Sequence, residues 1–309
     1  MASLVTKLLG LSAYTGLVAI TLPHLQTLSL SSPSLKVLTG VLPFLQPAPN
    51  SSTPAHPPAF QCLPQNYTTQ IVSLDPLVIY IHNFLSEADI PAPLAAGSPA
   101  FKPSYVYKDG RRQGTPDRTS SSAGLPLDDA AVQCVLARAE LFMGTTLAPG
   151  RDEMGPPQLV RYTAGQRFNV HHDWYESFQP DRATGRDRRW NRVASFFAIL
   201  EDGGVGGETW FPQVEAVAPQ DMAEEGTAPW GRFEKGGLAF KPVRGNAVFW
   251  VNLHANGTGD ERVVHAGLPV AEGLKTAMSI WPKRFVGPEA WGVKERGDIV
   301  VDEAETDPV

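Results

Sequence analysis

Short apolar runs separated by Gly, Pro and Asp turns make up most of the chain from about residue 60 to residue 290. Runs of this length, rich in β-branched and aromatic side chains, are typical of strands. They predict strands at Leu77–His82, Leu159–Tyr162, Arg167–His171, Val193–Leu200, Leu238–Lys241, Ala247–Val251, Arg262–His265 and Thr276–Trp281. Many short strands with one packing helix favour a barrel or a sandwich.

One segment has helical periodicity instead. Apolar side chains recur at three- and four-residue spacing from Val132 to Met143, after Asp128 as a candidate N-cap and before Gly144. Earlier in the chain, Ser86 is expected to cap a helical turn that Pro91 stops. The predicted fold class is therefore mainly β with supporting helices (α+β).

The N-terminal part has a different pattern. Leu8–Leu22 is uncharged and mostly apolar, but at about 1.5 Å per residue a helix of this length falls short of a bilayer core. It suits a signal-peptide core, a signal anchor that continues towards Leu30, or an amphipathic targeting segment. Since no A-x-A-like cleavage site stands out, an uncleaved anchor is slightly favoured. Pro47–Pro58 is a Pro/Ser-rich linker.

These patterns predict three parts. Residues 1–59 form the apolar targeting or anchor segment with its linker, residues 60–290 form the folded domain, and residues 291–309 form an acidic C-terminal tail. The 42% hydrophobic and 19% charged content is that of a globular protein, and the net charge of -6 argues against a nucleic-acid partner. Cys62 and Cys134 suit either one disulfide in an oxidising compartment or two buried thiols.

Candidate chemistry begins at His171-His172-Asp173. Residues two apart in a strand project from the same face, so His171 and Asp173 can converge while His172 points away. A histidine from a distant strand would complete a two-His, one-carboxylate set, which is typical of non-haem iron. His265 is the candidate for that third ligand.

A lysine ten residues after His265 could bind a carboxylate. Lys275 shares strand parity with Ala277, Ser279 and Trp281, so these side chains can line one face. A lysine inside a barrel requires a carboxylate to neutralise it. A dicarboxylate cosubstrate such as 2-oxoglutarate would supply one.

Several blocks of this sequence together resemble the catalytic domain of the prolyl 4-hydroxylase family. They are NFLS at Asn83–Ser86, RTSSS at Arg118–Ser122, the helix that ends in FMGT, LVRYTAGQRFNVHHDWYE, GGETWFP at Gly206–Pro212, KPVRGNAVFW at Lys241–Trp250 and HAGLPVAEGLKTAMSIWPK at His265–Lys283. The likeness spans about Leu77 to Phe285. It implies a double-stranded β-helix (jelly-roll) core.

The resemblance also implies the reaction and its residues. Fe(II), 2-oxoglutarate and O2 would be used to hydroxylate a C–H bond, with release of succinate and CO2 and with ascorbate as a further cofactor. The matching residues are His171, Asp173 and His265 for iron; Lys275, Tyr162, Thr209 and Trp281 for the cosubstrate pocket; and Arg118, Thr119 and Ser120 for a loop over a peptide substrate. Tyr162, Thr209, Trp281 and Arg118 each also suit a purely structural role.

Three functions are open at this stage. The first is hydroxylation of a peptidyl proline in the endoplasmic reticulum or secretory pathway. In this case the N-terminal segment could anchor the protein in the membrane. The second keeps the chemistry and acts on a free amino acid or small metabolite. The third is a catalytically silent binding module, which an intact set of His171, Asp173, His265 and Lys275 opposes.

Overall fold

The computed structural model describes residues 60–108, 111–216 and 228–292, and these are built around one large antiparallel sheet. Most of the predicted strands lie in it. Its order is β1 (Thr68–Leu74), β2 (Leu77–His82), β17 (Ala247–Val251), β12 (Ala194–Glu201), β19 (Val270–Ile280), β8 (Gln158–Thr163), β6 (Ser121–Gly124) and β3 (Lys102–Pro103), while β13 (Gly204–Gly206) pairs with β19.

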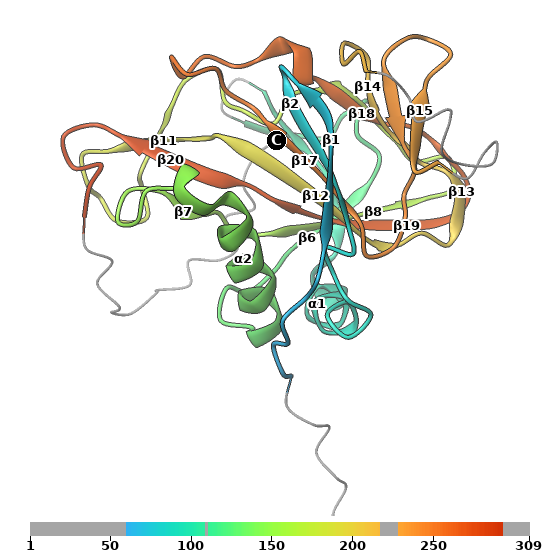
Figure 1. The fold of residues 1–309 in the computed structure, drawn as a ribbon, viewed down its shortest axis with the longest axis horizontal. Helices are drawn as coiled ribbons and strands as arrows, with labels where there is room; N and C mark the ends of the chain where they lie inside the picture. Colours follow the sequence, from blue (N-terminus) through green and yellow to red (C-terminus); the bar gives the residue numbers. More distant parts are fainter. Residues whose placement is uncertain (1–59, 109–110, 217–227, 293–309) are drawn as a thin grey trace, which may run out of the picture. The chain divides into compact units, whose positions relative to one another are not determined.

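A second sheet lies against one face of the first (Figure 1). Its order is β15 (Trp230–Arg232), β16 (Leu238–Phe240), β14 (Thr209–Phe211), β18 (His265–Gly267) and β9 (Phe168–His171). The chain passes back and forth between the two sheets. In chain order it forms β8 of the large sheet, β9 of the small one, β12 of the large, the β14–β16 pair of the small, β17 of the large, β18 of the small and β19 of the large. This alternation between two sheets is that of a jelly roll. The predicted double-stranded β-helix is confirmed.

Strand parity divides the apolar side chains between two cores. In β2 and β17, Tyr80 and Val248 face the small sheet and pack with Phe240, whereas Ile81 and Phe249 face the other way. Side chains that alternate along a strand must point to opposite faces, so both faces of these strands are buried. The large sheet is therefore covered on each side.

The helices cover the face of the large sheet opposite the small one (Figure 1). Helix α2 (Ala130–Met143) begins at Asp129, whose side chain accepts hydrogen bonds from the backbone of Ala131 and Val132. The N-cap is thus one residue later than expected. Helix α1 (Pro91–Gly97) corrects a second expectation, because Pro91 begins it rather than stopping a turn. Proline suits the first turn of a helix, because the N–H groups of that turn have no intrahelical acceptor and the missing N–H of proline costs no hydrogen bond.

The remaining described elements are short. They are β4 (Val106–Lys108) with β5 (Arg111–Gln113); a sheet of β10 (Gln179–Pro180), β11 (Arg189–Arg192), β20 (Pro282–Val286) and β7 (Glu153–Met154); and 3-10 turns at Ser98–Ala100, Gly144–Thr146 and Glu261–Val263. The strand expected at Arg262–His265 is wrong for its first part. Asp260 caps a 3-10 turn there, through a hydrogen bond from the Arg262 N–H.

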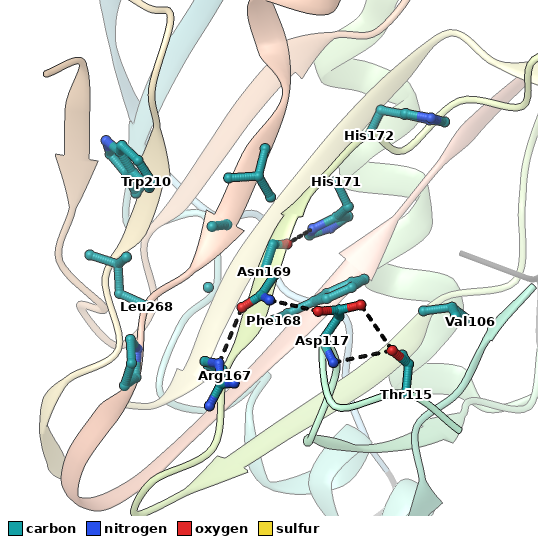
Figure 2. Close-up of a pocket in the computed structure, with 14 residues that line it drawn as sticks. Val106, Thr115, Asp117, Arg167, Phe168, Asn169, His171, His172, Trp210 and Leu268 are labelled. Carbon is teal, nitrogen blue, oxygen red and sulfur yellow. Dashed lines mark hydrogen bonds between the residues drawn. The ribbon is translucent and has the colours of Figure 1, made fainter. Parts of the chain in front are cut away.

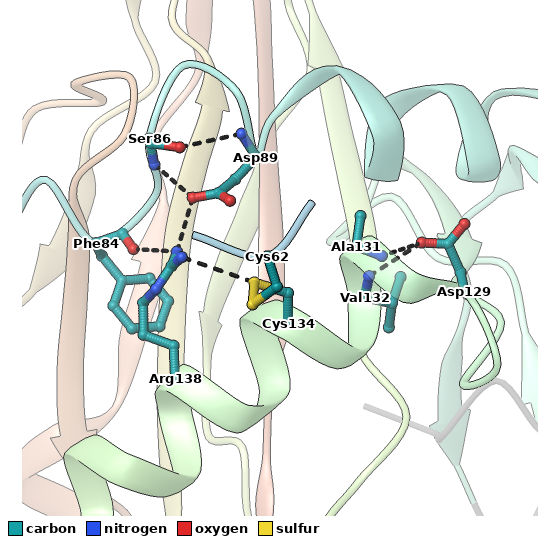
Figure 3. The surroundings of a disulfide bond; sticks show 9 residues. All are labelled: Cys62, Phe84, Ser86, Asp89, Asp129, Ala131, Val132, Cys134 and Arg138. Atoms are coloured by element: carbon teal, nitrogen blue, oxygen red, sulfur yellow. Dashed lines mark hydrogen bonds and ion pairs between the residues drawn. A yellow bond between two sulfur atoms is a disulfide. The ribbon is translucent and has the colours of Figure 1, made fainter. Parts of the chain in front are cut away.

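Cys62 and Cys134 form a disulfide that joins the segment before β1 to helix α2 (Figure 3). Nearby, the buried Arg138 guanidinium donates to Asp89, 2.8 Å away, and to the Phe84 carbonyl oxygen. Of the two states open from the sequence, the structure has the disulfide. The described residues contain no helix that is long and apolar enough to cross a membrane. The candidate anchor at Leu8–Leu22 and residues 293–309 of the predicted tail lie outside them.

Removing this disulfide is expected to lower thermal stability. The bond closes a 72-residue separation. Loss of such a loop constraint costs about 4 kcal/mol, or roughly 10 °C in Tm for a domain of this size. Calorimetry on a Cys62→Ser, Cys134→Ser double variant measures the effect. A reductant should lower the Tm of the wild type to that of the variant and leave the variant unaltered; a wild type insensitive to reductant contradicts the assignment.

Candidate metal and cosubstrate site

Two paired strands of the small sheet bring the three candidate ligands together. His171 in β9 lies opposite His265 in β18, and Asp173 follows β9 two residues later. Asp173 Oδ1 is 3.9 Å from His171 Nε2, and its Oδ2 is 3.9 Å from His265 Nε2. One ligand atom from each residue lies within 4.8 Å of the others, so the three could hold one metal ion.

Backbone carbonyls fix which nitrogen of each histidine faces this centre. His171 Nδ1 lies 2.8 Å from the Asn169 carbonyl oxygen, and His265 Nδ1 lies 3.1 Å from that of Val263. A carbonyl only accepts, so Nδ1 carries the proton and Nε2 keeps its lone pair. Burial lowers the pKa of both histidines below its ordinary value. Both rings are therefore neutral, which is the form that binds metals.

The Asp173 carboxylate is buried and held by two donors. Ser195 Oγ donates to Asp173 Oδ2 over 2.6 Å, and Trp281 Nε1 donates to the same oxygen over 3.0 Å. Burial raises the pKa of Asp173, but His265, His171, Arg192 and the Ser195 hydrogen bond outweigh it and bring the pKa to about 2. The carboxylate is thus ionised at neutral pH.

Lys275 lies on β19 with its ammonium buried beside the metal-ligand cluster. Its side chain is 2% exposed, and Nζ donates to the Gly207 carbonyl oxygen at 2.6 Å and lies 3.4 Å from Thr209 Oγ1. Among the described residues, no carboxylate lies within ion-pair distance of Nζ. Burial lowers the pKa of Lys275 to about 7, against a smaller opposing effect of Glu208. A carboxylate of a bound ligand could therefore pair with this ammonium.

A small inner cavity of about 30 Å³ joins the metal ligands to the residues near Lys275. Its walls are Arg118, Val160, Tyr162, Phe168, His171, Asp173, Phe197, Thr209, His265, Gly267, Ser279 and Trp281. Tyr162 is buried, and burial raises the pKa of its hydroxyl, so it stays a hydrogen-bonding phenol. Tyr162 and Thr209 both line this cavity, and their role as cosubstrate contacts stays a prediction. Trp281 lines the cavity too, with its indole N–H committed to Asp173.

An outer groove opens from this cavity (Figure 2). Phe168, His171 and Gly267 line both. One side of the groove carries a hydrogen-bonded row of polar side chains, in which Thr115 and Asn169 donate to Asp117 and Arg167 donates to Asn169. The other side carries Trp210, Leu268 and Pro269. The groove thus has a polar wall and an apolar wall.

The three residues of the expected substrate loop lie in different surroundings. Arg118 is 6% exposed, donates to the Tyr105 carbonyl and to Ser122, and lines the inner cavity. Thr119 and Ser120 line neither pocket. Thr119 Oγ1 donates to the Arg167 carbonyl, and Ser120 Oγ donates to Ser104. A role of this segment in substrate binding stays a prediction.

The donor set suits Fe(II) with a dicarboxylate beside it. Two imidazole nitrogens and one carboxylate oxygen on one side of an ion leave its other positions open, the arrangement of non-haem iron oxygenases. Lys275 has the charge that a second carboxylate would neutralise. It does not itself line the inner cavity, but Thr209, 3.4 Å from its Nζ, and Tyr162 do, and both are hydrogen-bonding groups.

Comparison with known proteins agrees with this donor set. Residues 157–283 match the 2OG-Fe(II) oxygenase superfamily, a stretch that includes all three candidate ligands and Lys275. Over this stretch the chain is similar to members of that superfamily. Prolyl 4-hydroxylase 1 of Arabidopsis thaliana is 28% identical over 225 residues, which cover 71% of this chain and 73% of the relative.

Two further proteins extend the comparison. The prolyl 4-hydroxylase subunit alpha-1 of Rattus norvegicus is 28% identical over 211 residues, which cover 67% of this chain but 34% of the rat subunit. Among solved structures, a viral collagen prolyl hydroxylase from Paramecium Bursaria Chlorella virus-1, in complex with 2OG, aligns with a TM-score of 0.47 and 18% identity over 67% of this chain and 96% of its own.

Some residues of the site were not found from the sequence. Ser195 is the donor to Asp173, and its signal is a lone hydroxyl in the apolar run VASFFAIL. The Gly207 carbonyl holds Lys275, and glycine is required there because φ is +75° and a Cβ would lie 2.9 Å from Val270. The groove residues Asp117, Asn169 and Trp210 come from separate segments, and no sequence pattern joins them.

Proposed function

We propose that this chain is an Fe(II)- and 2-oxoglutarate-dependent dioxygenase that hydroxylates prolyl residues in a peptide or protein. The observation that carries the proposal is the His171, Asp173 and His265 cluster, which shares one buried region with an ammonium that has no carboxylate partner among the described residues. A silent binding module has no need of this combination. The prolyl 4-hydroxylases that match the chain support the choice of substrate.

Each residue has a defined part in this proposal. His171, Asp173 and His265 hold Fe(II), and Lys275 with Thr209 and Tyr162 binds the 2-oxoglutarate carboxylate that is remote from the metal. With 2-oxoglutarate and O2, iron supplies the oxidising power that places one oxygen atom on a C–H bond and releases succinate and CO2. The apolar walls formed by Val160 and Phe197 keep water from the cavity, which strengthens the attraction between Lys275 and the cosubstrate.

The outer groove supports a peptide rather than a free metabolite. It is lined by five separate segments of the chain, His171 among them, and offers hydrogen-bonding groups on one wall and Trp210, Leu268 and Pro269 on the other. A peptide backbone can use the polar wall while a proline ring lies against the apolar one. Arg118–Ser120 is the segment predicted to contact this peptide.

The disulfide bears on the compartment in which the protein acts. The Cys62–Cys134 disulfide suits an oxidising compartment. The plant and animal prolyl 4-hydroxylases that match the chain are consistent with the secretory pathway in general. Residence in the endoplasmic reticulum, membrane anchoring through residues 1–59 and a need for ascorbate stay predictions.

A peptide assay tests the proposed function. The full chain, supplied with Fe(II), 2-oxoglutarate and O2, is expected to add 16 Da to proline-containing peptides and to release succinate in a one-to-one ratio. Tandem mass spectrometry then locates the added oxygen. The matched peptide with alanine in place of proline should gain nothing. Succinate release that a free amino acid stimulates and that no peptide stimulates contradicts the prolyl substrate but not the iron chemistry.

A further inference from the structure

The two oxygens of the Asp173 carboxylate have different surroundings. Oδ2 accepts hydrogen bonds from Ser195 Oγ and Trp281 Nε1. Among the described residues, no donor reaches Oδ1, the oxygen nearest His171 Nε2. An sp² oxygen has two lone pairs, and both of those on Oδ2 are engaged. The carboxylate is thus oriented with one oxygen anchored and the other available.

A buried asparagine contacts the Ser195 hydroxyl on the side away from Asp173. Asn252 Nδ2 lies 3.0 Å from Ser195 Oγ. An ionised carboxylate only accepts, so the single proton of the Ser195 hydroxyl must point to Asp173. The Ser195 oxygen is then an acceptor for Asn252, whose amide must turn its NH2 group towards it. This order of donors follows from the chemistry of the three groups, whichever way the amide is assigned.

Ser195 and Asn252 are held rigidly by the large sheet. Ser195 on β12 lies opposite Trp250 on β17, and Asn252 follows β17 directly. Asn252 is 0% exposed, its backbone N–H donates to the Val193 carbonyl, and its own carbonyl accepts from Asp260. Within the described chain its Oδ1 has no partner. Asn252 is therefore held by its backbone with its amide NH2 group at Ser195.

We propose that Ser195 and Asn252 form a positioning relay that keeps Asp173 turned to bind metal through one oxygen. The inference rests on the proposed function, since it assumes that Asp173 is a metal ligand. Without the relay, Asp173 Oδ2 loses its shorter hydrogen bond and the carboxylate can rotate away from the histidines. Groups that support a ligand in this way typically contribute 10- to 100-fold to metal affinity.

Metal titration of the full chain tests the relay without relying on turnover. Calorimetry with Co(II) as the probe gives one Kd for the wild type and for each variant. Ser195→Ala is expected to raise the Kd by about 10- to 100-fold. Ser195→Thr keeps the hydroxyl and should restore binding. Asn252→Leu is expected to give a smaller rise, because Ser195 still donates to Asp173 but loses the hydrogen bond that holds its own oxygen in place.

The control is Thr276→Val, which removes another buried hydroxyl of the large sheet, one that donates to Glu201. It should leave the Kd unchanged. A Ser195→Ala protein that binds Co(II) as tightly as the wild type overturns the relay. If Ser195→Ala does not fold, Asn252→Leu decides alone: a raised Kd upholds the relay and an unchanged Kd overturns it. A wild type that binds no Co(II) contradicts the proposed function itself.

Discussion

Replacing His171 or Asp173 with alanine is expected to abolish 2-oxoglutarate turnover while the protein stays folded. Each change removes one of the three candidate ligands found among the described residues, and Asp173 supplies the one negative charge of the three. Since loss of a supporting group already lowers metal affinity by about 10- to 100-fold, loss of a ligand itself should exceed that. Iron binding and succinate release, measured together on each variant, give the result.

The two variants differ in their expected stability. His171 is partly exposed at the edge of the outer groove, so His171→Ala should change Tm little. Asp173→Ala leaves the buried donors of Ser195 and Trp281 without an acceptor, which costs about 1–3 kcal/mol. His172→Ala is the matched control for metal content, because that side chain pairs with Glu176 instead. Full turnover in either ligand variant contradicts the site.

The first half of the metal site could be predicted because its geometry is local. Two residues of one strand, His171 and Asp173, share a face whatever sheet they join. The third ligand depended on strand pairing, which is not local. The His265 to His171 register arises from β18 and β9, and the segment before His265 is a capped 3-10 turn rather than the strand its Val residues indicate. His265 was named as the candidate from its residue type, and the family resemblance then matched it to an iron ligand.

The strands of the fold also differ in how well the sequence predicts them. Leu77–His82 and Ala247–Val251 were predicted with their observed bounds, because continuous β-branched and aromatic runs are buried on both faces. β19 begins at Val270, six residues before the predicted Thr276, since its first half pairs with β13 and β8 despite polar and Gly residues. Tertiary pairing overrides local propensity there.

Replacing Lys275 with alanine or methionine is expected to weaken 2-oxoglutarate binding far more than it slows turnover at saturation. The ammonium is buried at 2% exposure, so its pairing with a carboxylate is poorly screened. Removing one partner of a buried pair costs about 3 kcal/mol, or roughly 100-fold in Kd or apparent KM. Anaerobic titration of the Fe(II) protein with 2-oxoglutarate, followed by visible charge-transfer absorption, measures the Kd.

The pH dependence of the Kd for 2-oxoglutarate shows whether the charge of Lys275, rather than the packing of its side chain, contributes to binding. Burial brings the pKa of Lys275 to about 7, so the free protein loses this charge as pH rises above that value. Wild-type affinity should then fall by up to about tenfold per pH unit. Lys275→Met carries no charge at any pH and should give a flat profile. Lys283→Met, which removes a buried lysine that lies over Trp190, is the control and should keep the wild-type slope. An equal slope in Lys275→Met and the wild type would exclude Lys275 as the group that binds the carboxylate.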